Sequence, residues 1–138
     1  MDYEVLERVE MKVTTEDDII LVRRRVRDLA QLSRFNVFAT SAITTAASEL
    51  ARNVWVHAGH GRARIERLSD DGRLGLRLEF ADEGPGIADI DRALAGGFST
   101  AKSMGLGLSG SKRLVDEFAL DSRPGVGTTI TLIKWAPF

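Results

Sequence analysis

The stretch GLGLSG at residues 105–110 constrains the fold of this chain more than any other feature of its sequence. Three glycines within six residues allow a backbone to approach a ligand closely, and such stretches are typical of nucleotide loops. Gly105, Gly107 and Gly110 fit the dinucleotide fingerprint G-x-G-x-x-G. The same stretch followed by Ser111 and Lys112 approaches a P-loop. A third type of nucleotide loop depends on residues elsewhere in the chain.

The first two interpretations do not fit the surrounding sequence. A dinucleotide fingerprint needs a strand directly before it and a long βαβ unit after it. Polar STAKSM precedes the glycines here, and only 28 residues follow Gly110. In a P-loop the lysine follows the second glycine and a Ser or Thr comes next. Ser111–Lys112 reverses that order and moves the amine by about 100° around a helix. A purely structural role would explain one or two of the glycines only.

Length and composition predict one soluble globular domain spanning residues 1–138. The chain is 43% hydrophobic and 28% charged, with a net charge of −1 and no cysteine. Missing cysteines exclude disulfides and thiolate metal sites, and the weak charge argues against nucleic-acid binding. No apolar run is long enough for a membrane span, and the N-terminus lacks an export signal. We therefore expect a cytoplasmic protein with neither nucleic acid nor membrane as a partner.

Although the net charge is small, the chain contains one basic cluster, VRRRVRDLA at residues 22–30. Its arginines fall between the apolar positions of a predicted amphipathic helix, and Arg24 can pair with Asp28 at i+4. A solvated helix face is the simpler explanation, and docking of an acidic protein partner is the alternative.

The first half of the chain predicts a strand and two long helices. Alternating apolar residues indicate a strand over 3–13. Thr14 or Thr15 can cap a helix over 16–34, and a second helix is expected over 37–57. The core positions expected on this second helix are Phe38, Ala42, Ala46, Leu50 and Val54.

The second half predicts hairpins and a further long helix. Strands over 62–69 and 74–81 flank the turn DDGR. ADEGPGIADI then opens a short helix, 96–104 forms a loop, and a helix covers 106–118. Strands over 119–123 and 128–135 close the chain. This order predicts an α+β fold, a helix layer on one face of a mixed, mostly antiparallel sheet.

Three separated blocks accompany the glycine stretch in a fixed order. Glu49 and Asn53 lie at i and i+4 on one face of the second helix. Asp82 follows in DEGPG, then comes GLGLSG, and GTT at 127–129 stands near the end. These blocks resemble the GHKL superfamily, whose ATP-binding fold is shared by gyrase, Hsp90, histidine kinases and MutL. ELARN is similar to the N box, DEGPGI to the G1 box, GLGLSG to the G2 box and GTT to the final turn. The resemblance implies a two-layer α/β sandwich of the Bergerat type.

Within that superfamily the chain looks like the bacterial serine kinases that regulate sigma factors, and most like the RsbT-type switch kinases of the stressosome. That resemblance covers nearly the whole chain, through SELARNVWVHAGHG, ADEGPGI and KRLVDEF…GTTITLIKW. It implies an ATP- and Mg²⁺-dependent protein serine/threonine kinase. Its implied substrates are STAS-domain proteins, and a PP2C-type phosphatase is the partner that it then activates. Anti-sigma factor kinases, which sequester a sigma factor, are an alternative. A nucleotide-gated binding module without phosphotransfer is another.

The resemblance also implies roles for individual residues in ATP binding. The Asp82 carboxylate accepts a hydrogen bond from the adenine amino group, where guanine presents a carbonyl oxygen. Gly84 and Gly86 let the backbone approach the base, beside Ile87. Thr128 completes the Asp–water–adenine network.

The remaining implied roles concern the phosphates. Asn53 offers Mg²⁺ an amide oxygen, and Glu49 takes the proton from the attacking serine hydroxyl as general base. Residues 96–104 form a lid over ATP, and Lys102 or Lys112 can neutralise phosphate charge, although a surface position is the simpler explanation for each lysine. Triphosphate binding by backbone N–H groups at a helix N-terminus is expected from Gly105, Leu106, Gly107 and Leu108.

Overall fold

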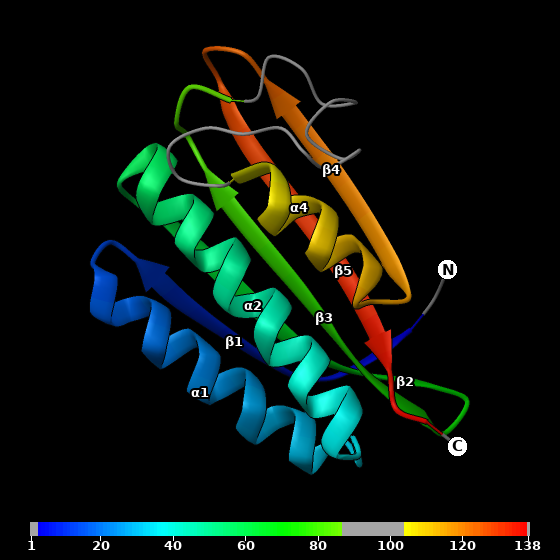
Figure 1. The fold of residues 1–138 in the computed structure, drawn as a ribbon. Coiled ribbons are helices and arrows are strands. Elements are labelled where there is room, and N and C mark those ends of the chain that lie inside the picture. Colours follow the sequence, from blue (N-terminus) through cyan, green and yellow to red (C-terminus); the bar gives the residue numbers. More distant parts are fainter. Residues whose placement is uncertain (1–2, 87–103, 138) are drawn as a thin grey trace.

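In a computed structural model that describes residues 3–86 and 104–137, helices cover one face of a single sheet (Figure 1). The sheet has the order β1-β2-β3-β5-β4, and every neighbouring pair is antiparallel. Its strands are β1 (Glu4–Val13), β2 (Gly61–Asp70), β3 (Arg73–Asp82), β4 (Glu117–Arg123) and β5 (Gly127–Trp135). The described helices are α1 (Glu16–Leu32), α2 (Val37–Ala58) and α4 (Met104–Arg113).

This architecture confirms the predicted α+β sandwich, with one refinement. The sheet is antiparallel throughout the described strands rather than mixed. α2 lies in the middle of the helix layer, between α1 and α4 (Figure 1). No helix in the described part of the chain is long and apolar enough to cross a bilayer. The short helix predicted after DEGPG lies outside the described residues, as does the predicted loop over 96–104 except for Met104, which is the first residue of α4.

The predicted helix over 106–118 is wrong in its length. α4 begins earlier, at Met104, and already ends at Arg113. The Leu114 N–H donates to the Ser111 carbonyl in a closing turn, and the Asp116 N–H donates to the Ile133 carbonyl of β5. Leu114, Val115 and Phe118 keep helical spacing, yet they pack on the core from a turn and a strand. Pairing with β5 therefore outweighs the local helical pattern.

The core lies between the sheet and the inner faces of α1 and α2. Ile43, Ala46 and Leu50 of α2 are fully buried against strand residues such as Leu78 and Phe80. The prediction that Phe38 also faces the core is wrong, because its side chain is 84% exposed. Ala39 is the first buried residue of α2. At the start of this helix the residue that faces the core is therefore Ala39 and not its neighbour Phe38.

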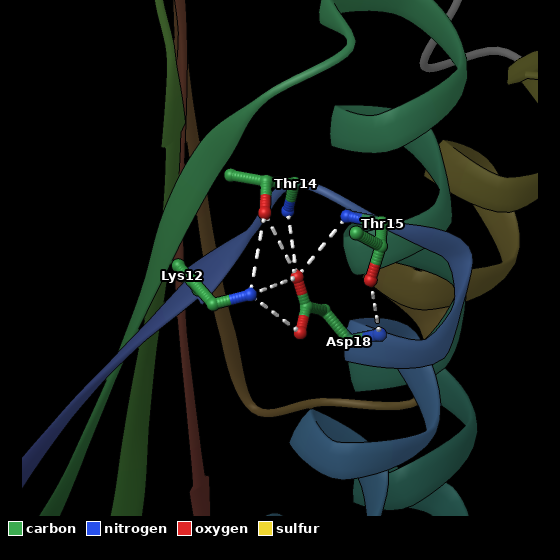
Figure 2. Close-up of polar contacts among 4 residues, drawn as sticks. All are labelled: Lys12, Thr14, Thr15 and Asp18. Atoms are coloured by element: carbon green, nitrogen blue, oxygen red, sulfur yellow. Dashed lines mark hydrogen bonds and ion pairs between the residues drawn. The ribbon is translucent and has the colours of Figure 1, made fainter.

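Asp18 joins the end of β1 to the start of α1 (Figure 2). Thr15 is the N-cap, and its hydroxyl accepts from the Asp18 N–H in a capping box. Asp18 Oδ2 in turn accepts from the backbone N–H groups of Thr14 and Thr15, at 2.9 and 3.1 Å. Lys12 Nζ donates to both carboxylate oxygens, at 3.2 and 3.1 Å. One buried carboxylate thus fixes the turn between the two elements.

Paired charges occupy the sheet face that the helices leave open. Glu66 of β2 is only 2% exposed and accepts from Arg8 Nε at 2.8 Å and from Arg77 Nε at 2.7 Å. Burial raises the pKa of Glu66, but the two guanidinium groups outweigh it and hold this pKa below its usual value. Arg64 pairs with Glu79 at 2.8 Å on neighbouring strands. Arg8, Arg64 and Arg77 of the sheet are therefore matched by carboxylates.

Candidate functional site

A row of residues crosses four strands at one end of the sheet. In the strand register Gly61 of β2 pairs with Asp82 of β3, Asp82 with Thr128 of β5, and Thr128 with Ser122 of β4. Side chains alternate between the two faces of a sheet. Asp82 stands two residues after buried Phe80, and Thr128 two residues before buried Ile130, so this row faces the helix layer.

Gly61 brings the last turns of α2 down onto this row. A Cβ at position 61 would lie 2.6 Å from Val54 Cγ1 and 3.2 Å from the Cβ of Asp82. The missing side chain therefore lets α2 sit directly on β2. Val54 follows Asn53 in the chain, so Asp82 and the end of α2 that carries Asn53 are brought together.

The G1 block begins with a turn that the Asp82 side chain makes itself. Asp82 Oδ1 accepts from the Gly84 N–H at 2.9 Å, the arrangement of an Asx turn. A Cβ on Gly84 would lie 2.6 Å from the Ala58 Cβ, and one on Gly86, where φ is +78°, would lie 2.4 Å from the Arg123 carbonyl oxygen. Both glycines are thus required by contacts within the protein. Their approach to a base stays a prediction, and Ile87 lies outside the described residues.

Asn53 is the polar residue of α2 that most clearly indicates a ligand. Its side chain is 7% exposed, and its amide nitrogen has no hydrogen-bond partner within the described part of the chain. Native proteins rarely leave a buried amide unpaired. Glu49 lies one turn earlier on the same face and is partly exposed. The amide oxygen and the carboxylate are both of the chemical type that a Mg²⁺–phosphate group requires.

Ser122 is a site residue that the sequence analysis missed. Its hydroxyl oxygen lies 2.8 Å from that of Thr128, and both residues are buried. It also lies 3.4 Å from the Gly127 carbonyl oxygen. Ser122 belongs to no recognisable motif, and only the pairing of β4 with β5 brings it to Thr128. A register prediction for this hairpin was the one signal that could have identified it.

The glycine stretch forms the beginning of a helix rather than a loop. Gly105 and Leu106 lie in the first turn of α4, whose N–H groups have no partner within a helix. Gly107 and Leu108 lie further in, and the Leu108 side chain is fully buried in the core. Ser111, also missed from sequence, is buried on α4, and its hydroxyl has no hydrogen-bond partner among the described residues. Lys112 is exposed, and Lys102 is outside the described residues.

A hollow of about 520 Å³ lies at this end of the sheet. Asp82, Gly127 and Thr128 line it together with residues of the opposite sheet face, such as Ala81 and Thr129. It therefore wraps around the end of the sheet next to the row. The described residues contain no group of three His, Asp or Glu side chains that could hold a metal ion. A metal bound here would therefore need ligands from a phosphate and from water.

Comparison with known proteins identifies the family of the chain. Residues 13–134 match the family described as histidine kinase-like ATPase domain. The chain is 46% identical over 125 residues to "Serine/threonine-protein kinase RsbT" of Bacillus subtilis (strain 168), covering 91% of this chain and 94% of the relative. It is 30% identical over 99 residues to "Anti-sigma F factor" of Caldanaerobacter subterraneus, covering 67% and 68%.

A solved structure shares the fold at much lower sequence identity. The match is to "The crystal structure of SiaB-SiaC complex from Pseudomonas aeruginosa", with a TM-score of 0.57 and 14% identity over 95% of this chain and 90% of the other. At this identity the likeness supports the fold alone. The family model and the two sequence relatives go further, because they span most of the chain: it belongs to the histidine kinase-like ATPase family, in the branch that contains RsbT and the anti-sigma F factors.

Proposed function

We propose that this chain is an ATP- and Mg²⁺-dependent protein serine/threonine kinase of the RsbT type. The observation that carries the proposal is the meeting of Asp82, Thr128 and the Asn53 end of α2 on one side of the sheet. The name of the relative with 46% identity supports phosphotransfer to serine or threonine. The buried amide nitrogen of Asn53, which has no hydrogen-bond partner among the described residues, supports a ligand at this place.

Adenine recognition is assigned to the row of residues across the sheet. Asp82 Oδ1 is engaged by the Gly84 N–H, which leaves Oδ2 to accept from the adenine amino group. Guanine presents an acceptor at that position, so GTP would leave the carboxylate unpaired at a cost of about 1–3 kcal/mol. Thr128 supplies a hydroxyl next to Asp82 on the neighbouring strand.

The phosphates are assigned to α2 and to the first turn of α4. N–H groups of Gly105 and Leu106 point along a helix axis whose N-terminal end attracts anions. The Asn53 amide oxygen would hold Mg²⁺, which in turn would neutralise charge on the triphosphate. Glu49, one turn away, would take the proton of the attacking serine hydroxyl, a contribution of about 10²–10⁴-fold to the rate.

The proposed substrates are serine or threonine residues of STAS-domain proteins of a stressosome. After phosphorylation the kinase would change partner and activate a PP2C-type phosphatase in the cytoplasm. Support for these partners comes from the extent of the match to RsbT, which is longer and more identical than the match to the anti-sigma F factor. Sequestration of a sigma factor is the second candidate function. Its support is the 30% identity with the anti-sigma F factor, which is lower than the 46% identity with RsbT.

The test is transfer of labelled phosphate from ATP to a purified STAS-domain protein. The wild type should label the STAS protein, and Glu49→Ala should bind ATP with unchanged affinity but lose transfer. Glu10→Ala, which removes an exposed carboxylate on β1, is the matched control and should transfer normally. Normal transfer by Glu49→Ala would overturn the general-base role. ATP binding without transfer to any STAS protein would favour the nucleotide-gated binding module. Capture of a sigma factor instead would favour the anti-sigma function.

A further inference from the structure

The outward face of α1 carries large apolar side chains that the fold does not bury. On its inner face, Val22 and Val26 are fully buried. On the opposite side, Ile20 is 56% exposed, Leu21 48% and Leu32 61%. Single exposed apolar residues are common on protein surfaces. Three of them along about 18 Å of the axis of one helix form a more unusual surface.

Four arginines lie between these apolar residues, and all four are exposed. Within the described residues none of them forms an ion pair, and the pairing of Arg24 with Asp28 that the sequence allows is not formed. This contrasts with the sheet, where Arg8, Arg64 and Arg77 each contact a carboxylate. The four arginines of α1 without an ion pair are Arg23, Arg24, Arg25 and Arg27.

Residues 19–34 carry a charge opposite to that of the rest of the chain, whereas α1 as a whole is neutral because Glu16, Asp17 and Asp18 precede the arginines. Residues 19–34 contain five arginines and one aspartate, a net charge of +4 in a chain of net charge −1, so the rest carries −5. An extended polyanion such as RNA would be repelled by that remainder. A second copy of α1 would bring like charges together. An acidic protein segment matches the arginine stretch of α1 without either penalty, since arginine binds carboxylates in a bidentate manner and is enriched at interfaces.

The position of α1 leaves the candidate nucleotide site accessible. α1 and α4 lie on opposite sides of α2 in the helix layer (Figure 1). A partner on the outward face of α1 would therefore not cover the row that contains Asp82 and Thr128. We propose that the outward face of α1, formed by Ile20, Leu21, Leu32 and the four arginines between them, is a docking surface for an acidic protein segment with apolar side chains on one side.

The probe for this surface is an 18-residue amphipathic peptide with leucines on one face and glutamates on the other. Two matched peptides replace the glutamates by lysines or the leucines by serines. Titration with the full chain should show binding of the first peptide only, with amide chemical-shift changes concentrated in residues 19–34. The affinity should fall steeply as salt is raised, because exposed charges are screened.

Charge reversal provides the decisive comparison. Arg24→Glu/Arg25→Glu should weaken peptide binding at least tenfold, and Leu21→Ser/Leu32→Ser should weaken it at least threefold. Arg62→Glu/Arg123→Glu makes the same charge change at exposed positions elsewhere and should alter binding less than twofold. Helix content, measured on each variant, and ATP affinity, measured on the two α1 variants, should stay unchanged.

Several results would overturn the proposal. These are the absence of binding, equal affinity for the reversed variant, preference for the lysine peptide, and shift changes outside residues 19–34. Binding to phosphatidylserine vesicles or to RNA without binding to the acidic peptide would assign the surface to another class of ligand. Self-association that persists in Arg24→Glu/Arg25→Glu would assign it to a second copy. None of these outcomes depends on phosphotransfer, so a failure of the proposed kinase activity remains distinguishable.

Discussion

The hydroxyl oxygens of Ser122 and Thr128 lie 2.8 Å apart, directly across from each other in β4 and β5. Both residues are buried on the side of the sheet that carries Asp82. If Ser122 donates to the Thr128 hydroxyl at 2.8 Å rather than to the Gly127 carbonyl oxygen at 3.4 Å, Thr128 keeps its own proton for a ligand or for Asp82 on the next strand. Ser122 would then act as a positioning residue, which orients a hydroxyl that contacts the nucleotide.

Replacing Ser122 by alanine should therefore weaken ATP binding although Ser122 itself does not reach the ligand. The loss of one hydrogen bond of about 1 kcal/mol corresponds to about a fivefold change in affinity. Ser122→Thr keeps the hydroxyl and should restore binding. Ser33→Ala serves as the control. It removes a buried hydroxyl that also forms two hydrogen bonds, with Leu29 and Arg67, at the C-terminal end of α1. Calorimetric titration with ATP measures each variant, and equal affinity of Ser122→Ala and wild type would contradict the role.

Asp82→Asn should abolish ATP binding while the fold stays intact. The asparagine side chain keeps an oxygen that can accept from the Gly84 N–H, so the turn should survive. Its second group is an NH₂ donor, which faces the donor of adenine. We expect at least a hundredfold loss of affinity for ATP, with an unchanged thermal melting curve. Asp28→Asn, at an exposed position on α1, is the matched control. Unchanged ATP affinity in Asp82→Asn would remove the adenine assignment.

Asn53→Ala should distinguish a metal ligand from a simple packing residue. If the amide oxygen holds Mg²⁺, affinity for ATP should fall at least tenfold in the presence of Mg²⁺ and much less in EDTA. Because the amide nitrogen has no partner within the described residues, its removal should break no hydrogen bond of that nitrogen inside the protein. Fluorescent ATP titrated with and without Mg²⁺ provides the measurement. Equal losses in both conditions would contradict metal ligation.

The sequence predicted those parts of the fold that depend on local periodicity. The strand and helix starts of the first half agree with the structure to within one or two residues, from β1 to β3. The prediction failed where tertiary contacts compete with a local pattern. Residues 114–118 have helical spacing, but backbone pairing with β5 draws them out of α4. Phe38 has the position of a core residue, but the orientation of α2 turns Ala39 inward instead.

The site was predictable where its residues stand in motifs, and only there. Asp82, Asn53 and Thr128 were selected from short blocks with a recognisable order. Ser122 and Ser111 stand in no such block, and strand register or burial is needed to find them. The requirement for glycine at position 61 could not be predicted from the sequence either, because it depends on how closely Val54 of α2 approaches β2.

The Asp18 junction between β1 and α1 predicts a stability that depends on pH in the acid range. The hydrogen bond from the Thr14 N–H is the main cause that holds the pKa of Asp18 well below its usual value; burial acts against it, and Lys12 adds to the lowering. An aspartate whose pKa is lowered by folding stabilises the protein while it is ionised in both states. This stabilisation is complete above the ordinary pKa of about 3.9 and is lost progressively as the pH falls toward the folded-state pKa.

Asp18→Ala should therefore lower the thermal midpoint at pH 7 by about 5 °C, because it removes the Asp18 half of the capping box and the bonds to Thr14, Thr15 and Lys12. The difference from wild type should stay constant from pH 7 to about 5 and shrink below about pH 4. Asp17→Ala removes an exposed acid from the same first turn and should change the midpoint by less than about 2 °C at any pH. Melting curves recorded by circular dichroism between pH 3 and 7 provide the measurement. A difference that grows as the solution is acidified would show that the ionised Asp18 does not stabilise the junction.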